Sequence, residues 1–222
     1  MEFLKHGNFE YVFCAPEGEG KVPVIIFLHG AGTRGTSTQC LSTNPFFSEN
    51  SLYNKPESPA LIFAPLCMHN SWFDVFEQLQ EFVKFALTHP RADQDRLYLI
   101  GASMGGYGVW QLAMTMSEYV AALFPVCGGG MYWNYKPLLH IPVWTVHGTA
   151  DKTVFPDDSI RFVEMINHYG GEAHITLLEG VPHASWNAAF ADKEIRDWLF
   201  SQRKKVKSDD GINEYADSKK FG

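Results

Sequence analysis

The sequence lacks any apolar segment long enough to cross a membrane as a helix. No stretch of its 222 residues approaches 18 consecutive apolar residues. Its first residues, "MEFLKHGNFE", also lack the basic region followed by an apolar stretch that is typical of a secretion signal. If the sequence is complete, these absences predict a cytoplasmic protein that does not bind a membrane.

Cysteine is scarce, and its spacing forms no motif. The four cysteines stand far apart with no CxxC pair, so we expect reduced, mostly buried thiols. The sequence also has no HExxH and no histidine–carboxylate spacing on one helical face, and no GxxxxGK[ST] follows its glycine-rich segments. We therefore expect neither a metal site nor a cofactor.

Basic residues are too few for a nucleic-acid surface. The formal net charge is -7, while hydrophobic residues make up 45% of the chain and charged residues 19%, an ordinary globular balance. A chain of this length fits one domain with a sizeable core. We expect a small molecule as the partner, and the sequence predicts no oligomeric state.

Apolar strand-like runs alternate with amphipathic helical stretches along residues 1–200, which we take as one domain. This alternation predicts an α/β domain with a mostly parallel sheet and helices on both faces. The strand-like runs are 22–28, 60–64, 96–100, 120–126, 141–147 and 174–178. The expected helices are 72–86, 104–117, 157–169 and 186–200. Residues 201–222 lose the apolar periodicity, so we expect a polar tail that is mobile or loosely docked.

One serine stands among small residues where a strand-like run meets a helical one, in "LYLIGASMGGYGVW", residues 97–110. A strand that turns into a helix within about three residues forces its apex residue into a crowded backbone conformation, which only small neighbours tolerate. The apex side chain then stands clear, with the helix N-terminus behind it. We predict that Ser103 is a nucleophile; its alternative role is a helix N-cap in a tight turn.

A serine nucleophile needs a neighbouring base, and His183 is the candidate. In an open parallel sheet, ligands bind beyond the carboxyl ends of the strands. His183 lies in a loop after the last strand-like run, in "LLEGVPHASW". By contrast, His29 and His147 end strands before glycines, and His89 and His168 fall near helix ends.

The acid that orients the imidazole is predicted to be Asp151, in "VHGTADKTV". It lies four residues beyond the strand that ends at His147, in a natural loop position. Its rivals, Asp157 and Asp158, follow a proline just before a helical stretch and fit helix capping better.

Two backbone donors are needed for the tetrahedral oxyanion. The elbow supplies one, the N–H of Met104, the residue after the nucleophile. The second is expected from "LHGAGTRG", where Ala31 is the favoured donor and Gly32 the next. The alternative is a plain glycine turn after a strand.

The segments "GASMGG", "LHGAGTRG", "HGTADKTV" and "GVPHASW" together resemble the α/β-hydrolase superfamily, whose triad follows the same chain order of Ser, Asp and His. The resemblance is closest to its small carboxylesterase, dienelactone hydrolase and feruloyl-esterase-like group, and it covers about residues 22–200. The HGAG segment departs from the lipase-type HGGG and is similar to the HGxG form of small carboxylesterases. This resemblance implies a single-domain α/β-hydrolase fold and a serine hydrolase of carboxylic esters.

Other functions use the same parts. A peptidase or a thioesterase would share the triad, while a lyase would form no acyl-enzyme. A non-catalytic binding module would not need an intact triad.

The substrate pocket is expected to be open and to favour small acyl groups. The place where this superfamily usually inserts a lid holds only residues 127–140, too few for a helical cap. Residues 32–59, rich in polar and turn residues, could form one wall. Gly32, Trp72 and Trp186 lie near strand ends and are the candidate substrate contacts.

Overall fold

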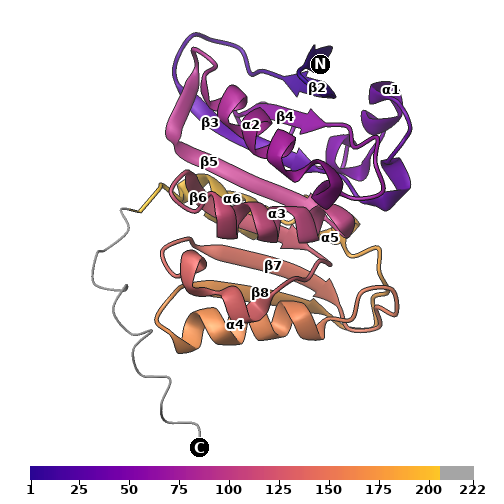
Figure 1. Ribbon diagram of the computed structural model, residues 1–222, viewed down its shortest axis with the longest axis vertical. Helices are drawn as coiled ribbons and strands as arrows, with labels where there is room; N and C mark the ends of the chain where they lie inside the picture. Colours follow the sequence, from indigo (N-terminus) through magenta and orange to yellow (C-terminus); the bar gives the residue numbers. More distant parts are fainter. Residues whose placement is uncertain (206–222) are drawn as a thin grey trace, which may run out of the picture.

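The computed structural model describes residues 1–205 and shows one eight-stranded sheet, in the order β1-β2-β4-β3-β5-β6-β7-β8 (Figure 1). The pairs β1–β2 and β2–β4 are antiparallel and all others are parallel, as the alternation of strands and helices predicts. The strands are β1 (Glu2–His6), β2 (Phe9–Cys14), β3 (Val22–Leu28), β4 (Leu61–Pro65), β5 (Ala92–Ala102), β6 (Val120–Val126), β7 (Val143–Gly148) and β8 (Ala173–Leu178).

Helices cover both faces of the sheet. The α-helices are α1 (Thr38–Leu41), α2 (Phe76–Leu87), α3 (Met104–Thr115), α4 (Asp157–His168), α5 (Trp186–Ala191) and α6 (Lys193–Ser201). Short 3-10 turns are η1 (Ala31–Thr33), η2 (Pro45–Phe47), η3 (Trp72–Val75), η4 (Tyr132–Asn134) and η5 (Lys136–Leu138). Helices α2, α3 and α4 pack on one face, and α1, α5 and α6 pack on the other (Figure 1).

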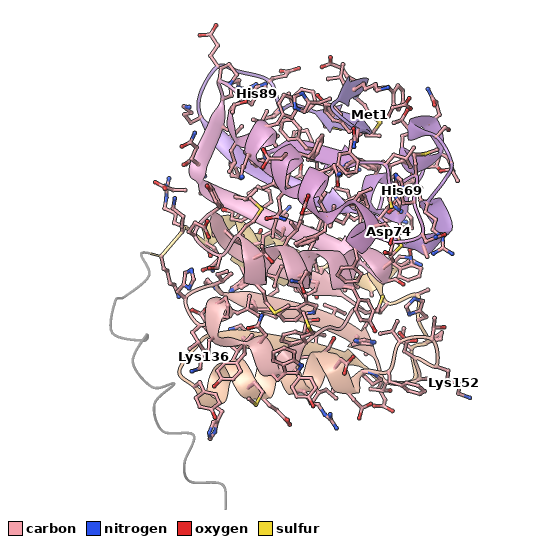
Figure 2. All side chains as sticks on the ribbon, viewed as in Figure 1. Met1, His69, Asp74, His89, Lys136 and Lys152 are labelled. Carbon is pink, nitrogen blue, oxygen red and sulfur yellow. The ribbon has the colours of Figure 1, made fainter. Side chains whose placement is uncertain are left out.

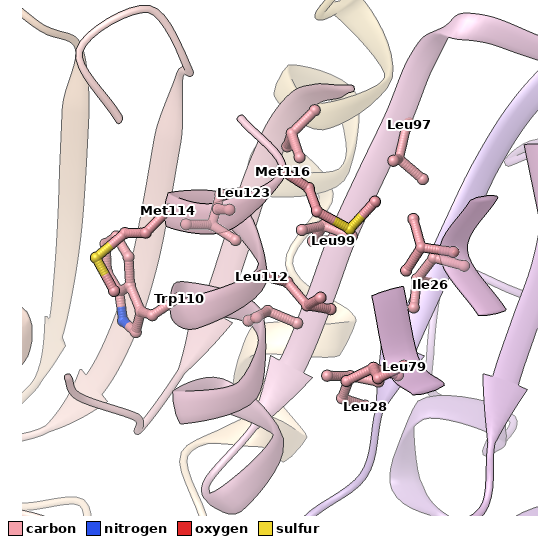
Figure 3. Close-up of a cluster of buried hydrophobic side chains, with 14 of the residues drawn as sticks. Ile26, Leu28, Leu79, Leu97, Leu99, Trp110, Leu112, Met114, Met116 and Leu123 are labelled. Atoms are coloured by element: carbon pink, nitrogen blue, oxygen red, sulfur yellow. The ribbon is translucent and has the colours of Figure 1, made fainter. Parts of the chain in front are cut away.

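The central strands are apolar throughout because both of their faces are buried. In β3, Ile26 and Leu28 point into the cluster that contains α2 and α3, while Ile25 and Phe27 point into the opposite cluster. Figure 3 shows the first cluster, in which Leu112 of α3 lies over the sheet. This packing holds the carboxyl ends of the parallel strands at one edge.

Figure 2 locates that edge: His69, Asp74 and Lys152 lie along it, and His89 and Lys136 lie at the opposite one. His69 follows the end of β4 and Lys152 follows the end of β7. The loops that carry the predicted site therefore converge on the side of the molecule where Lys152 lies.

Two features differ from the sequence-based expectation. The hairpin of β1 and β2 was not predicted. β1 is exposed along its whole length and carries no long apolar run, whereas β2 is mostly buried and its apolar residues were overlooked. Its turn contains Gly7, whose φ of 54° is in the left-handed region that favours glycine. The helix expected at 186–200 is two helices, α5 and α6, because Asp192 is extended and accepts a hydrogen bond from Ile195 N as the N-cap of α6.

The described part of the expected tail is residues 201–205, of which Ser201 still belongs to α6 and 202–205 dock on β5. Lys204 N donates to Asp95 O at 2.8 Å, and the Tyr98 hydroxyl donates to Gln202 O at 2.8 Å. The rest of that tail, 206–222, lies outside the described residues. Within residues 1–205 all four cysteines are free thiols, and no helix has the length and apolarity needed to cross a membrane.

Candidate active site

Ser103 stands at the apex of the turn between β5 and α3. Its φ of 55° and ψ of -120° place a non-glycine residue in the left-handed half of conformational space, which is the crowding predicted from its small neighbours. Its backbone N–H donates to Val126 O at 2.9 Å, which ties the turn to the end of β6. The turn presses against β3, since a Cβ on Gly105 would lie 1.9 Å from Leu28 O.

The three predicted triad residues meet at this edge of the sheet. His183 Nε2 lies 2.8 Å from Ser103 Oγ, and His183 Nδ1 lies 2.6 Å from Asp151 Oδ2. Both distances are those of hydrogen bonds between the proposed nucleophile, base and acid. Ser103 comes from the end of β5, Asp151 from the loop after β7 and His183 from the loop after β8.

Asp151 is held in one orientation. Its Oδ1 accepts hydrogen bonds from Thr153 N at 2.9 Å and from Val154 N at 3.0 Å, while Oδ2 faces His183. Burial acts to raise the pKa of the Asp151 carboxyl, but the hydrogen bonds from His183 and the two backbone donors outweigh it, so the pKa is lowered. The carboxyl is therefore ionised at neutral pH, as an acid that orients an imidazole must be.

The rival carboxylates, Asp157 and Asp158, both lie in the first turn of α4, where negative charge is favourable. Neither is a hydrogen-bond partner of His183, whose Nδ1 pairs with Asp151. Their position fits the helix-terminus role expected of them.

A close approach between two loops brings His183 to Asp151. A Cβ on Gly148 would lie 2.1 Å from Val181 O, so only glycine lets the loop after β8 cross the end of β7. Ala150 N donates to Val181 O at 3.1 Å across this contact. The His183 ring is partly exposed and meets the Trp186 ring edge-on, with centroids 5.3 Å apart. Trp186 thus borders the candidate base, and its role as a pocket wall stays a prediction.

The two predicted oxyanion donors are each the first residue of a helical segment, and both segments lie beside the nucleophile. Met104 is the first residue of α3 and Ala31 the first of η1, so helix geometry gives neither N–H an acceptor within its own helix. The two segments touch, because a Cβ on Gly30 would lie 3.5 Å from Ser103 Cβ. Gly32, the second choice, is exposed on the same turn.

A buried neutral histidine holds the Ala31 segment in place. His29 Nδ1–H donates to Gly30 O at 2.8 Å, and His29 Nε2 accepts from Cys67 N at 3.0 Å. Because Nε2 accepts, the ring carries a single proton. Burial lowers the pKa of His29 to about 4, which matches that neutral form.

Trp72 does not line a pocket, contrary to the expectation. Its side chain is fully buried, where its Nε1–H donates to His29 O at 3.1 Å and its ring packs against Phe9. Gly108 of α3 lies beside it, since a Cβ there would be 3.2 Å from the indole. Trp72 is part of the apolar stripe of the expected helix 72–86. This periodicity was the sequence signal for a position in the core.

A thiol that the sequence analysis left out lies beside the triad. Among the described residues, one group of metal-ligating side chains comes together, Cys127, Asp151 and His183, with ligand atoms within 4.8 Å of one another. Burial raises the pKa of Cys127 to about 12, so its sulfur is a thiol and a poor ligand. Asp151 and His183 are already hydrogen-bonded to each other. The group therefore consists of two residues of the candidate triad with a neighbouring thiol.

An apolar groove runs along α3 away from the nucleophile. Tyr107 N donates to Ser103 O at 3.1 Å, which places Tyr107 one turn beyond the elbow. The groove has a volume of about 450 Å³. Its lining comes from η3, the start of α2, α3 and the loop after β6: Phe73, Phe76, Tyr107, Gln111, Met114, Gly130 and Met131.

Solved structures with similar folds include esterases and a peptidase. A thermostable esterase is 28% identical with a TM-score of 0.82, over 88% of this chain and 60% of that one. Est1E from Butyrivibrio proteoclasticus is 13% identical with a TM-score of 0.67, over 89% of this chain and 96% of that one. The acylaminoacyl peptidase of Pyrococcus horikoshii is 16% identical with a TM-score of 0.65, over 90% of this chain and 41% of that one.

The chain therefore spans about three-fifths of the thermostable esterase and two-fifths of the peptidase. No curated protein matches the sequence. At the family level, residues 53–218 match the dienelactone hydrolase family, a span that includes all three predicted triad residues. With its α/β-hydrolase fold and this match over most of its length, the chain belongs to the dienelactone hydrolase family.

Proposed function

We propose that the protein is a serine hydrolase that cleaves carboxylic esters through an acyl-enzyme. The observation that carries this proposal is the unbroken chain of hydrogen bonds from Ser103 Oγ through His183 to Asp151, at 2.8 and 2.6 Å. Family membership and the 28% identity to a thermostable esterase support an ester substrate.

The geometry supports a two-step reaction. Ser103 Oγ attacks the acyl carbon while its proton passes to His183 Nε2, and Asp151 stabilises the imidazolium that forms. The N–H groups of Ala31 and Met104 bind the oxyanion. The intermediate collapses as His183 returns its proton to the leaving alcohol, and a water activated by the same imidazole then releases the acid and frees Ser103.

A fluorophosphonate probe tests the nucleophile, because only an activated serine attacks phosphorus readily. We expect one label per chain, on Ser103, together with loss of ester hydrolysis. Ser103→Ala should abolish both, whereas Ser201→Ala, at the exposed end of α6, should change neither. Active enzyme that stays unlabelled, or labelling at another residue, would contradict the mechanism.

We further propose that short acyl groups are preferred and that bulky alcohols such as sugars are accepted. Support comes from the segment 127–140, which holds two single-turn 3-10 helices, η4 and η5, and no α-helix that could form a cap. Each methylene contributes about 0.8 kcal/mol only where protein surface covers it, so long acyl chains should gain little in an uncapped site.

A substrate panel tests this preference and separates esters from the amide and thioester alternatives. It contains p-nitrophenyl esters from acetyl to dodecanoyl, acetylated sugars, thioesters and aminoacyl amides, the last because a peptidase shares the fold. Feruloyl esters are included because ferulic acid binds Est1E. We expect kcat/KM to be highest from acetyl to butyryl; a maximum at dodecanoyl would contradict the open pocket.

A further inference from the structure

His147 lies at the end of β7, four residues before Asp151, and its side chain is fully buried. The sequence shows it only as a strand-ending histidine before a glycine. In the structure its Nε2 lies 3.0 Å from Val154 O and 3.3 Å from Asp151 Oδ2. Its Nδ1 lies 2.9 Å from Ser159 Oγ in α4.

Counting protons shows which ring nitrogen must be a donor. Both neighbours of Nε2, a carbonyl oxygen and an ionised carboxylate, can only accept hydrogen bonds. Nε2 must therefore carry a proton whether the ring is neutral or charged. That proton is hydrogen-bonded to Val154 O and also lies close to Asp151 Oδ2, 3.3 Å from Nε2, which is the same oxygen that receives the Nδ1–H of His183 at 2.6 Å.

The other side of the ring responds to its charge. The Ser159 hydroxyl has one proton and two neighbours, His147 Nδ1 and Gly128 O, the latter at 2.7 Å. With a neutral ring the hydroxyl donates to Nδ1; with a charged ring Nδ1–H donates to the hydroxyl, which then donates to Gly128 O. Burial lowers the pKa of His147, although Val154 O and Asp151 act to raise it, so the neutral form dominates at neutral pH.

We propose that His147 is a positioning residue for the catalytic acid, whose Nε2–H is a second donor to Asp151 Oδ2 and so shares that carboxylate with His183. The proposal rests on the proposed serine hydrolase function. It extends the hydrogen-bonded chain beyond Asp151 to Ser159 in α4 and Gly128 after β6.

The electrostatic consequence has a definite sign. An N–H close to Asp151 partly neutralises the carboxylate charge, so it weakens the attraction between Asp151 and a proton on the His183 ring. Without that donor, Asp151 attracts the proton on His183 more strongly, so the base stays protonated to higher pH. Two ionisable groups act on the His147 ring, Asp151 in its own loop and His183 after β8. Cys127 after β6 lies beside both of these groups, and Asp158 is the sequence neighbour of Ser159 in α4.

The test compares pH profiles of kcat/KM for three proteins with the same ester. His147→Leu removes the donor, and His147→Gln keeps an uncharged N–H near the position of Nε2. We expect His147→Leu to lower kcat at least tenfold at unchanged KM and to move the acidic limb of the profile up by half a pH unit or more. His147→Gln should restore most of both.

His140→Gln is the matched control. That imidazole is half-buried, has one hydrogen bond to Ser117 O, and lies before β7, near the end of that strand opposite to His147. It should leave the acidic limb in place. A purely structural role for His147 would lower the rate equally at every pH with an unmoved limb, and that result would overturn the proposal.

A second measurement needs no variant that has to fold. In protein labelled with ¹⁵N-histidine, long-range ¹H–¹⁵N spectra report which ring nitrogens are protonated, and we expect a protonated Nε2 at His147. A bare Nε2 would also overturn the inference. If the fluorophosphonate probe does not label Ser103 in the wild-type protein, that result would instead refute the serine hydrolase function itself.

Discussion

At the scale of single residues, the carboxylate of Asp151 is the most heavily bonded group of the site. It accepts two backbone N–H bonds on one oxygen, and its other oxygen faces His183 and His147. Its lowered pKa keeps this carboxylate ionised at neutral pH and below. The orientation of the imidazole therefore depends on this one side chain.

Asp151→Asn should lower kcat by about 10⁴ while the fold stays intact, the scale known for a triad whose histidine is held in the wrong tautomer. An asparagine can still accept from Thr153 N and Val154 N, so folding should change little. Stopped-assay kinetics and a thermal melt measure the two effects. Asp158→Asn serves as the control; a loss of this size there would assign the acid to α4.

These residue roles could be predicted from the sequence only in part. Ser103, Asp151 and His183 could be proposed as a triad because each follows a strand-like run and the three occur in the order of a hydrolase triad, and the structure brings them within hydrogen-bond distance. His147 and Ser159 were not, because their role depends on a count of donors around one imidazole, which spacing does not reveal. Trp72 was misassigned as a pocket wall because its place near a strand end outweighed its place in a buried stripe.

At the scale of elements, the contact between α3 and β3 determines the position of Ser103 relative to the sheet. The first turn of α3 lies directly on the end of β3, where Gly105 meets the carbonyls of Leu28 and His29. No side chain fits in this contact. The position of the nucleophile is thus set by backbone packing against the sheet.

Gly105→Ala should therefore destabilise the fold by about 2 kcal/mol or more, since its methyl group would overlap backbone atoms that cannot rotate away. Urea unfolding measures the change, and the hydrolysis rate should fall because the elbow must shift. Gly20→Ala, in a loop where a Cβ would meet nothing within 4 Å, should stay within about 0.5 kcal/mol of wild type. Equal stabilities of the two variants would refute this account of the contact.

The elements that were predictable are those with strong periodicity. The runs 22–28 and 120–126 coincide with β3 and β6, because strands buried on both faces are continuously apolar. β1 could not be predicted because an exposed edge strand has no such pattern, whereas the buried β2 was overlooked despite its apolar residues. The break between α5 and α6 escaped because the apolar stripe continues across the capping residue Asp192.

At the scale of the whole molecule, stability depends on keeping imidazoles buried and neutral. His29 takes up a proton near pH 6.5 in the unfolded chain but only at about 4 when folded, so acid favours unfolding. This contribution is fully present above pH 6.5 and is lost as the pH falls toward 4. Burial lowers the pKa of His147 in the same direction.

From His29 alone, the free energy of unfolding should fall by about 2 kcal/mol between pH 7 and pH 5. His29→Asn should reduce the loss over that range. Urea midpoints at the two pH values measure the difference. His174→Asn is the control, because that ring is half exposed on β8 and should leave the pH dependence unchanged. Identical slopes for all three proteins would refute the linkage.

Because the candidate triad residues lie far apart in the chain, the proposed hydrolytic activity should appear only when folding is complete, and it can be used to follow folding. Ser103 and His183 are 80 residues apart, and the loop that carries His183 reaches Asp151 only after β8 has docked beside β7. Such non-local contacts are the slow ones to form, because the intervening chain must be ordered first. During synthesis or refolding, the fluorescence of the buried tryptophans can therefore follow the part of the sheet that forms first. Under the proposed function, the first turnover of an ester requires that β8 has joined the sheet beside β7.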